Sequence, residues 1–211
     1  MSDYRSRLRP PQRARRSSSP PAPAAAVQQG ESFQTRDGRS LLLRAIHPDD
    51  AESLRRAFAR MTPEQVRMRV FHALTELPEP VARQLCAVDP EKVAAFVVTD
   101  ADGSEIRAEA RVHFDSVTEA AEFAIAVDPA FVGQGLGLRL MTRLLATARE
   151  RGMREIWGDV LVENTPMLAL SDHLGFERTA DPGDPGLLRL SLLLDPPVQG
   201  RKKQRGAKSR N

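Results

Sequence analysis

The chain has 211 residues, a net charge of +3, one cysteine and four histidines. This length is sufficient for one globular domain that folds without disulfides or bound metals. The single cysteine, Cys86, excludes an internal disulfide, and the histidines show no metal-ligand spacing, so we expect a cytoplasmic protein without a metal. No apolar run approaches the roughly 20 residues that span a bilayer, which argues against a membrane protein.

The positive charge is concentrated at the two ends of the chain. Residues 1–32 carry a net charge of +4 and residues 197–211 a net charge of +6. Because the whole chain carries +3, the residues between these two ends carry a net charge of −7. The N-terminal end is rich in Pro, Ala, Ser and Arg, a composition that does not bury a core. We predict a disordered basic arm over 1–37, one folded domain over 38–195 and a disordered basic tail over 196–211. The alternative to a solubilising role is weak contact with nucleic acid.

The first part of the domain is predicted to be a strand followed by three helices. Residues 41–46 form a short apolar run, and a helix starts at 47–50 with apolar residues at helical spacing after it. A second helix is expected from Thr62 and a third over 80–85.

A β-meander is predicted next. Residues 93–99 and 105–114 are rich in strand-forming residues and flank a hairpin signal at 100–103. The third strand, 120–127, is followed by Asp128-Pro129, and because proline cannot donate a ladder bond we expect strand pairing to stop or splay there.

The last third combines helices and strands. A helix over 135–151 has apolar residues on one side and Gly152 as its cap, and a strand over 156–162 follows. Asn164 or Thr165 caps a second helix, before final strands at 176–179 and 187–194. Antiparallel strands followed by a strand-helix-strand unit predict a mixed α/β fold, in which helices flank a mostly antiparallel central sheet.

The turn between the strand 120–127 and the long helix has the sequence Val132-Gly133-Gln134-Gly135-Leu136-Gly137. Glycines allow positive φ and close approach of an anion, and a helix N-terminus presents unpaired N–H groups, so the turn predicts a phosphate site. The dinucleotide fingerprint requires a glycine where the chain has Leu138, and the P-loop requires a lysine that is absent. Both of these phosphate-binding motifs are excluded.

The turn resembles the acyl-CoA motif [QR]-x-x-G-x-[GA] of the GCN5-related N-acetyltransferase (GNAT) superfamily, with Val132 in place of the usual Gln or Arg. The resemblance extends over roughly residues 40–194 and is strongest from 120 to 177, where it includes the segments 121–127, 160–168 and 174–176. These segments are similar to the Pat-like branch of bacterial protein-lysine acetyltransferases. The resemblance implies a V-shaped opening between two splayed central strands.

The resemblance also implies a set of site residues. Acetyl-CoA would be the co-substrate, with its pyrophosphate on residues 132–137. Its pantetheine arm would lie on the strand backbone at Ile125, Ala126 and Val127 and beside Asn164, which is also a candidate helix cap. Glu122 matches the general base of the branch.

The general acid is left open by the sequence. Many members of the superfamily use a tyrosine where this chain has Ser171, and the only tyrosine here is Tyr4, in the predicted arm. Ser171, His173 or water are candidates for protonating the CoA thiolate, or it leaves unassisted; as structural residues, Ser171 and His173 would lie on a helix surface.

The predicted function is transfer of an acetyl group to a primary amine, with a protein lysine as the first choice of acceptor. A small-molecule amine is the rival acceptor. A different class of function is a catalytically weak acyl-CoA-binding scaffold that docks on nucleic acid or the ribosome through its basic tails. Cys86 has no neighbouring histidine motif and is predicted to be a small buried apolar residue.

Overall fold

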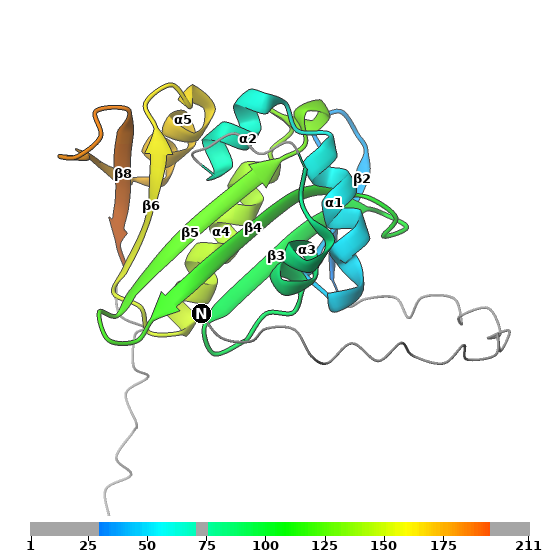
Figure 1. The fold of residues 1–211 in the computed structure, drawn as a ribbon, viewed down its shortest axis with the longest axis horizontal. Helices are drawn as coiled ribbons and strands as arrows, with labels where there is room; N and C mark the ends of the chain where they lie inside the picture. Colours follow the sequence, from blue (N-terminus) through cyan, green and yellow to red (C-terminus); the bar gives the residue numbers. More distant parts are fainter. Residues whose placement is uncertain (1–29, 71–75, 195–211) are drawn as a thin grey trace, which may run out of the picture.

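The computed structural model describes residues 30–70 and 76–194, which form one eight-stranded sheet with helices on both faces (Figure 1). The strand order is β1-β2-β3-β4-β5-β6-β8-β7, and all neighbours are antiparallel except β5 and β6. The strands are β1 Glu31–Gln34, β2 Ser40–Ala45, β3 Val93–Asp100, β4 Ile106–Asp115, β5 Ala120–Val127, β6 Glu155–Leu161, β7 Glu177–Ala180 and β8 Leu187–Leu193. The predicted mixed α/β class is confirmed.

The strand β1 corrects the predicted start of the domain. Residues 31–34 pair with 40–43 of β2, and Phe33 packs against the core, whereas we expected residues 1–37 to be disordered. The main-chain ladder with β2 holds this edge strand although Phe33 is its only large apolar side chain. The rest of the predicted arm, 1–29, and residues 195–211 of the predicted tail lie outside the described residues.

One face of the sheet is covered by α4, Leu136–Glu150, which lies behind the strands in Figure 1. Leu140, Met141 and Leu144 have no exposed surface, because the i, i+1, i+4 spacing places them on the same side of the helix. They pack with buried residues of β4 and β5 in the larger of two hydrophobic clusters. The predicted long helix is confirmed.

The opposite face carries α1, Ala51–Ala59, and α3, Glu79–Cys86, over a second hydrophobic cluster that includes Leu54, Ala82 and Val97. A short 3-10 turn, η1 Pro48–Asp50, precedes α1. Its Asp50 is buried and accepts two hydrogen bonds from Arg44 at 2.6 and 2.7 Å, which ties the start of the helical segment to β2. In the part of the chain that the structure describes, no helix has the length and hydropathy to cross a membrane.

Cys86 lies in this second cluster with 1% of its surface exposed, as predicted. Burial, reinforced by the charge of Asp50, raises the pKa of its thiol to about 11. A raised pKa depletes the reactive thiolate at every pH below it. We therefore expect iodoacetamide to leave the native protein unmodified at pH 8 while it alkylates urea-unfolded protein readily, as followed by intact-mass spectrometry. Equal rates in the two states would contradict the burial.

Candidate active site

The strands β5 and β6 form a V. They pair only through Ala120–Glu122 and Glu155–Trp157, although β5 continues to Val127 and β6 to Leu161. The apex of the V is therefore the pair Glu122 and Trp157. One edge of β5 stays paired with β4 as far as Val127. Beyond the apex the other edge of β5 does not pair with β6, so its main-chain N–H and C=O groups can bind a ligand.

The pairing of β5 with β4 stops at Val127, as predicted from Asp128-Pro129, but β5 separates from β6 earlier, after Glu122. The next pair after the apex would join Phe123 to Gly158. A Cβ on Gly158 would lie 2.8 and 2.9 Å from atoms of the Phe123 ring, and that ring also packs edge-to-face on Phe176 with 5.6 Å between centroids. The Phe123 ring fills the space over Gly158, and the strands separate at this contact.

The glycine turn has the backbone that the sequence predicts. Gly133 and Gly135 have φ values of +79° and +90°, and Gly135 is the N-cap of α4. The helical ladder begins with the Arg139 N–H, which donates to the Gly135 carbonyl at 3.2 Å, so the amides of Leu136 and Gly137 precede it. These amides point out of the helix end, where they suit an anion.

The first hairpin of the chain braces this turn. Arg36 donates to the Gly133 carbonyl at 3.0 Å, and the Asp37 N–H donates to the Gln134 side chain at 3.2 Å. Hydrogen bonds from Arg39 and Thr35 lower the pKa of Asp37 to about 2, so its carboxylate stays charged at neutral pH. Sequence reasoning missed these contacts because it assigned residues 1–37 to the arm.

Replacing Gly135 by alanine tests the turn. A Cβ at this position meets nothing within 4 Å, so the cost arises from φ alone, about 1–2 kcal/mol of unfolding free energy. A shifted turn also moves the amides that donate charge-assisted hydrogen bonds to the phosphates. We therefore expect the affinity for CoA, measured by calorimetry, to fall roughly tenfold or more. Gly152→Ala is the matched control: Gly152 has φ +74° and open space at the other end of α4, so stability falls and affinity does not. An unchanged CoA affinity in Gly135→Ala would contradict the assignment.

Glu122 is exposed at the apex of the V. Its neighbours Ala121 and Phe123 are buried on the α4 side, so Glu122 and Ala124 face the other side of the sheet. There it lies opposite His113 of β4 and Trp157 of β6. A carboxylate at this place is accessible to solvent and adjoins the opening between the strands.

Trp157 is half-buried beside Glu122. The guanidinium of Arg189 stacks 4.1 Å from the centre of its ring and is held by Asp159 at 2.9 Å. These contacts belong to the face that carries Glu122, because strand alternation turns Trp157 away from the buried Ile156.

The helix α5, Thr165–Leu174, forms the other wall of the opening. The Asn164 side chain accepts a hydrogen bond from the Met167 N–H at 3.2 Å and so caps this helix, as predicted. Ser171 corrects the expectation of a surface residue: it is fully buried, and its hydroxyl donates to the Leu168 carbonyl at 2.7 Å. His173 is exposed.

The helix α2, Pro63–Val70, crosses the open end of the V (Figure 1). Gln65 donates to the Val127 carbonyl at 3.4 Å, and Arg67 forms an ion pair with Glu163 in the loop after β6. The turn, the apex carboxylate and the two flanking helices therefore surround the edge of β5 that does not pair with β6.

Known proteins with a similar sequence identify the family of this chain. Residues 51–176 match the acetyltransferase (GNAT) family. An acetyltransferase of Pseudomonas aeruginosa is 30% identical over 150 residues, which span 70% of this chain and 81% of that protein. The [ribosomal protein bS18]-alanine N-acetyltransferase of Escherichia coli is 36% identical over 85 residues, 40% of this chain and only 48% of that enzyme.

The fold agrees with a solved structure of the same family. The GNAT domain of S. lividans PAT superposes with a TM-score of 0.71 and 25% identity, covering 78% of this chain and 97% of that domain. The family match spans more than half of the chain, and it includes the glycine turn and both strands of the V. The chain therefore belongs to the acetyltransferase (GNAT) family and is an acyl-CoA-dependent N-acyltransferase.

Proposed function

We propose that this protein transfers the acetyl group of acetyl-CoA to a lysine side chain of a protein acceptor, by direct attack with Glu122 as the general base. The observation that carries the proposal is the place of Glu122, exposed at the apex of the V between β5 and β6. A base at this apex adjoins both the opening for the thioester and the uncovered face from which an amine approaches.

The lysine amine must lose a proton before it attacks. Its ordinary pKa is about 10.4, so forming the neutral amine at pH 7 costs roughly 4.6 kcal/mol. Glu122 takes this proton directly or through one water, and the nitrogen then bonds to the thioester carbon. The nitrogen then releases its second proton to solvent, and collapse of the tetrahedral intermediate breaks the carbon–sulfur bond and yields the amide and the CoA thiolate.

The remaining contacts come from main-chain groups and one amide side chain. A β5 amide near Ile125, Ala126 or Val127, freed by the splay, donates to the oxyanion. The oxygen of Asn164 is engaged by Met167, which leaves its NH₂ group for the pantetheine arm. Residues 132–137 form the pyrophosphate site, in which the amides of Val132 and Gln134 already donate to the Pro129 and Phe131 carbonyls and the amides of the glycines and Leu136 bind the anion. The Val132 side chain is 51% exposed and has no donor to add.

The CoA thiolate leaves without a protein acid. The hydroxyl of Ser171 is buried and already donates within α5, so it is not placed to protonate sulfur. A CoA thiol is acidic enough, near the cysteine value of about 8.5, for water to serve this purpose.

The acceptor class is supported by charge. The region between the basic ends carries a net −7, which attracts a cationic lysine segment. A second candidate is the α-amine of a protein, favoured by the relative whose name specifies alanine of a ribosomal protein. An α-amine has a pKa of about 7.7–8.0 and needs less help from a base.

Product identification tests the proposal. The full chain is incubated with isotope-labelled acetyl-CoA and a panel that contains lysine-rich proteins, peptides with free N-terminal alanine, and polyamines. Thiol release gives the rate, and peptide mass spectrometry gives the modified atom. We expect label on lysine Nζ. Label confined to α-amines or polyamines would overturn the lysine assignment, and CoA binding without turnover on any amine would overturn the proposal as a whole.

A further inference from the structure

An apolar cavity lies beside the proposed reaction centre. It has a volume of about 290 Å³, is open to solvent on one side, and is lined by α1, by α3 with the residue Leu77 before it, and by the strands β4 and β5. Its walls are mainly Leu54, Ala57, Phe58, Leu77 and Leu85, and its other side reaches Ala126 and Val127. We call this space the α1–α3 pocket. A pocket of this size and lining is typical of sites for apolar ligands.

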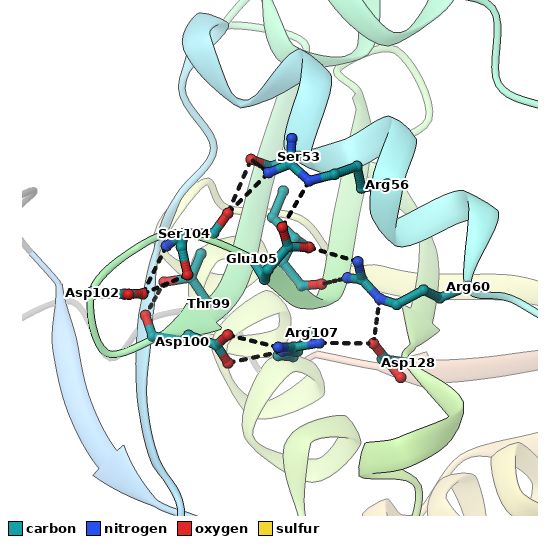
Figure 2. A network of polar contacts seen from close by, with 11 residues as sticks. Ser53, Arg56, Arg60, Thr99, Asp100, Asp102, Ser104, Glu105, Arg107 and Asp128 are labelled. Carbon is teal, nitrogen blue, oxygen red and sulfur yellow. Dashed lines mark hydrogen bonds and ion pairs between the residues drawn. The ribbon is translucent and has the colours of Figure 1, made fainter.

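The charged side chains around the pocket form ion pairs with one another. At its rim, Arg60 bonds to Asp128 at 2.8 Å and to Glu105 at 2.6 Å (Figure 2). In the same network Arg107 bonds to Asp100 at 2.7 Å and to Asp128 at 3.5 Å.

Inside the pocket the charges are also paired. Glu109 and Arg111 form an ion pair at 2.6 Å with side chains only 8% and 5% exposed. A cation such as a lysine ammonium would lose its hydration here and would have to compete with arginines for these carboxylates. The α1–α3 pocket therefore favours a neutral hydrocarbon group.

The pocket lies on the same face of β5 as Glu122 but farther along the strand. Ala126 is four residues after Glu122, a separation of about 13 Å at 3.3 Å per residue. Between them β5 carries only the small Ala124 on this face, and opposite it on β4 lies Arg111, which is held in the pocket wall by its ion pair with Glu109. The substituents of a tetrahedral carbon diverge. If the sulfur follows the open edge of β5 and the amine approaches from the Glu122 side, the acyl tail is directed away from both, over the face of β5 that carries Ala126.

We propose that the α1–α3 pocket binds the acyl tail of the donor, and that the enzyme prefers straight-chain acyl groups of about four to eight carbons over acetyl. The proposal rests on the proposed function for the position of the thioester. Each methylene that enters an apolar pocket should raise affinity, and with it kcat/KM, by up to about threefold to fourfold until the pocket is full.

The test uses acetyl-, butyryl-, hexanoyl- and octanoyl-CoA with the full chain. Calorimetric binding requires no acceptor, and transfer to the amine panel gives kcat/KM for each donor. We expect the Kd of hexanoyl-CoA to lie at least tenfold below that of acetyl-CoA. Ala57→Phe fills the pocket and should abolish this difference while acetyl-CoA binds as before. Ala59→Phe, at an exposed position of the same helix, should leave it intact.

Each outcome decides the assignment. Equal affinity for all four donors, or a chain-length preference that survives Ala57→Phe, overturns it. If Ala57→Phe weakens only the binding of peptide acceptors with apolar residues beside the amine, the pocket belongs to the acceptor, and the acyl-tail assignment is also overturned. Where Ala57→Phe fails to fold by circular dichroism, Ala57→Leu replaces it. Affinity that rises with chain length in a protein that transfers no acyl group supports the pocket and refutes the proposed function.

Discussion

Glu122→Gln is expected to lower kcat by a factor of about 10²–10⁴, the usual contribution of a general base. Glutamine keeps the size and shape of the side chain but does not accept a proton from the amine. The KM for acetyl-CoA should change little, because the pyrophosphate and pantetheine contacts come from the turn and the strand backbone. Steady-state thiol release with the best acceptor from the amine panel measures both quantities.

The pH profile separates the loss of a base from general damage. A variant without a base depends on the fraction of amine that is already neutral, and this fraction grows as the pH rises toward the amine pKa of about 10.4. The loss in kcat of Glu122→Gln relative to the unsubstituted protein should therefore become smaller at high pH. Glu150→Gln is the matched control, since Glu150 is an exposed glutamate at the far end of α4 and its loss should leave kcat unchanged. A deficit in Glu122→Gln that is constant with pH would argue against the base assignment.

Asp128→Ala is expected to lower the free energy of unfolding by about 3–5 kcal/mol, as when one partner of a buried ion pair is removed. The Asp128 side chain is 5% exposed and accepts bonds from Arg60 and Arg107 (Figure 2). It also accepts from the Ala130 N–H at 3.0 Å, which caps η2, Pro129–Phe131, just before the glycine turn. Without this carboxylate, the two partly buried guanidinium groups of Arg60 and Arg107 lose a partner, and η2 loses the cap that holds the chain just before the glycine turn.

Urea unfolding followed by circular dichroism measures the change. Asp128→Asn retains the cap and the shape but not the charge, and should cost less than alanine. Glu91→Ala is the control for an exposed ion pair, because Glu91 lies 3.9 Å from Arg151 at the surface, and it should change stability by less than about 0.5 kcal/mol. A cost for Asp128→Ala as small as this would show that the network does not hold β4, β5 and α1 together.

The sequence was sufficient where the signal is local. The glycine turn, the apolar side of α4 and the cap at Asn164 all depend on residues a few positions apart, and each was predicted in place. Asp128-Pro129 correctly marks the end of β5. The earlier separation of β5 from β6 had no local signal, because it occurs where Phe123 meets Gly158, which are distant in the chain.

Three other features depend on tertiary packing and had no sequence signal. The strand β1 is held by main-chain pairing around the single apolar residue Phe33, so its polar composition was misleading. Ser171 is buried because α5 packs that side of the helix against the sheet, and a serine among apolar residues does not reveal this. The α1–α3 pocket likewise arises from how two helices sit on β4, which no single segment of sequence encodes.

The contact between the first hairpin and the glycine turn links the edge of the sheet to the ligand. Arg36 and Asp37 hold the turn from a segment that is itself kept in place mainly by the ladder with β2. Whatever binds the turn in its present shape must, by mass action, also favour the docked state of β1. Amide hydrogen exchange of residues 31–37 would then slow in the presence of CoA, making the outermost strand a reporter of occupancy at the centre of the molecule.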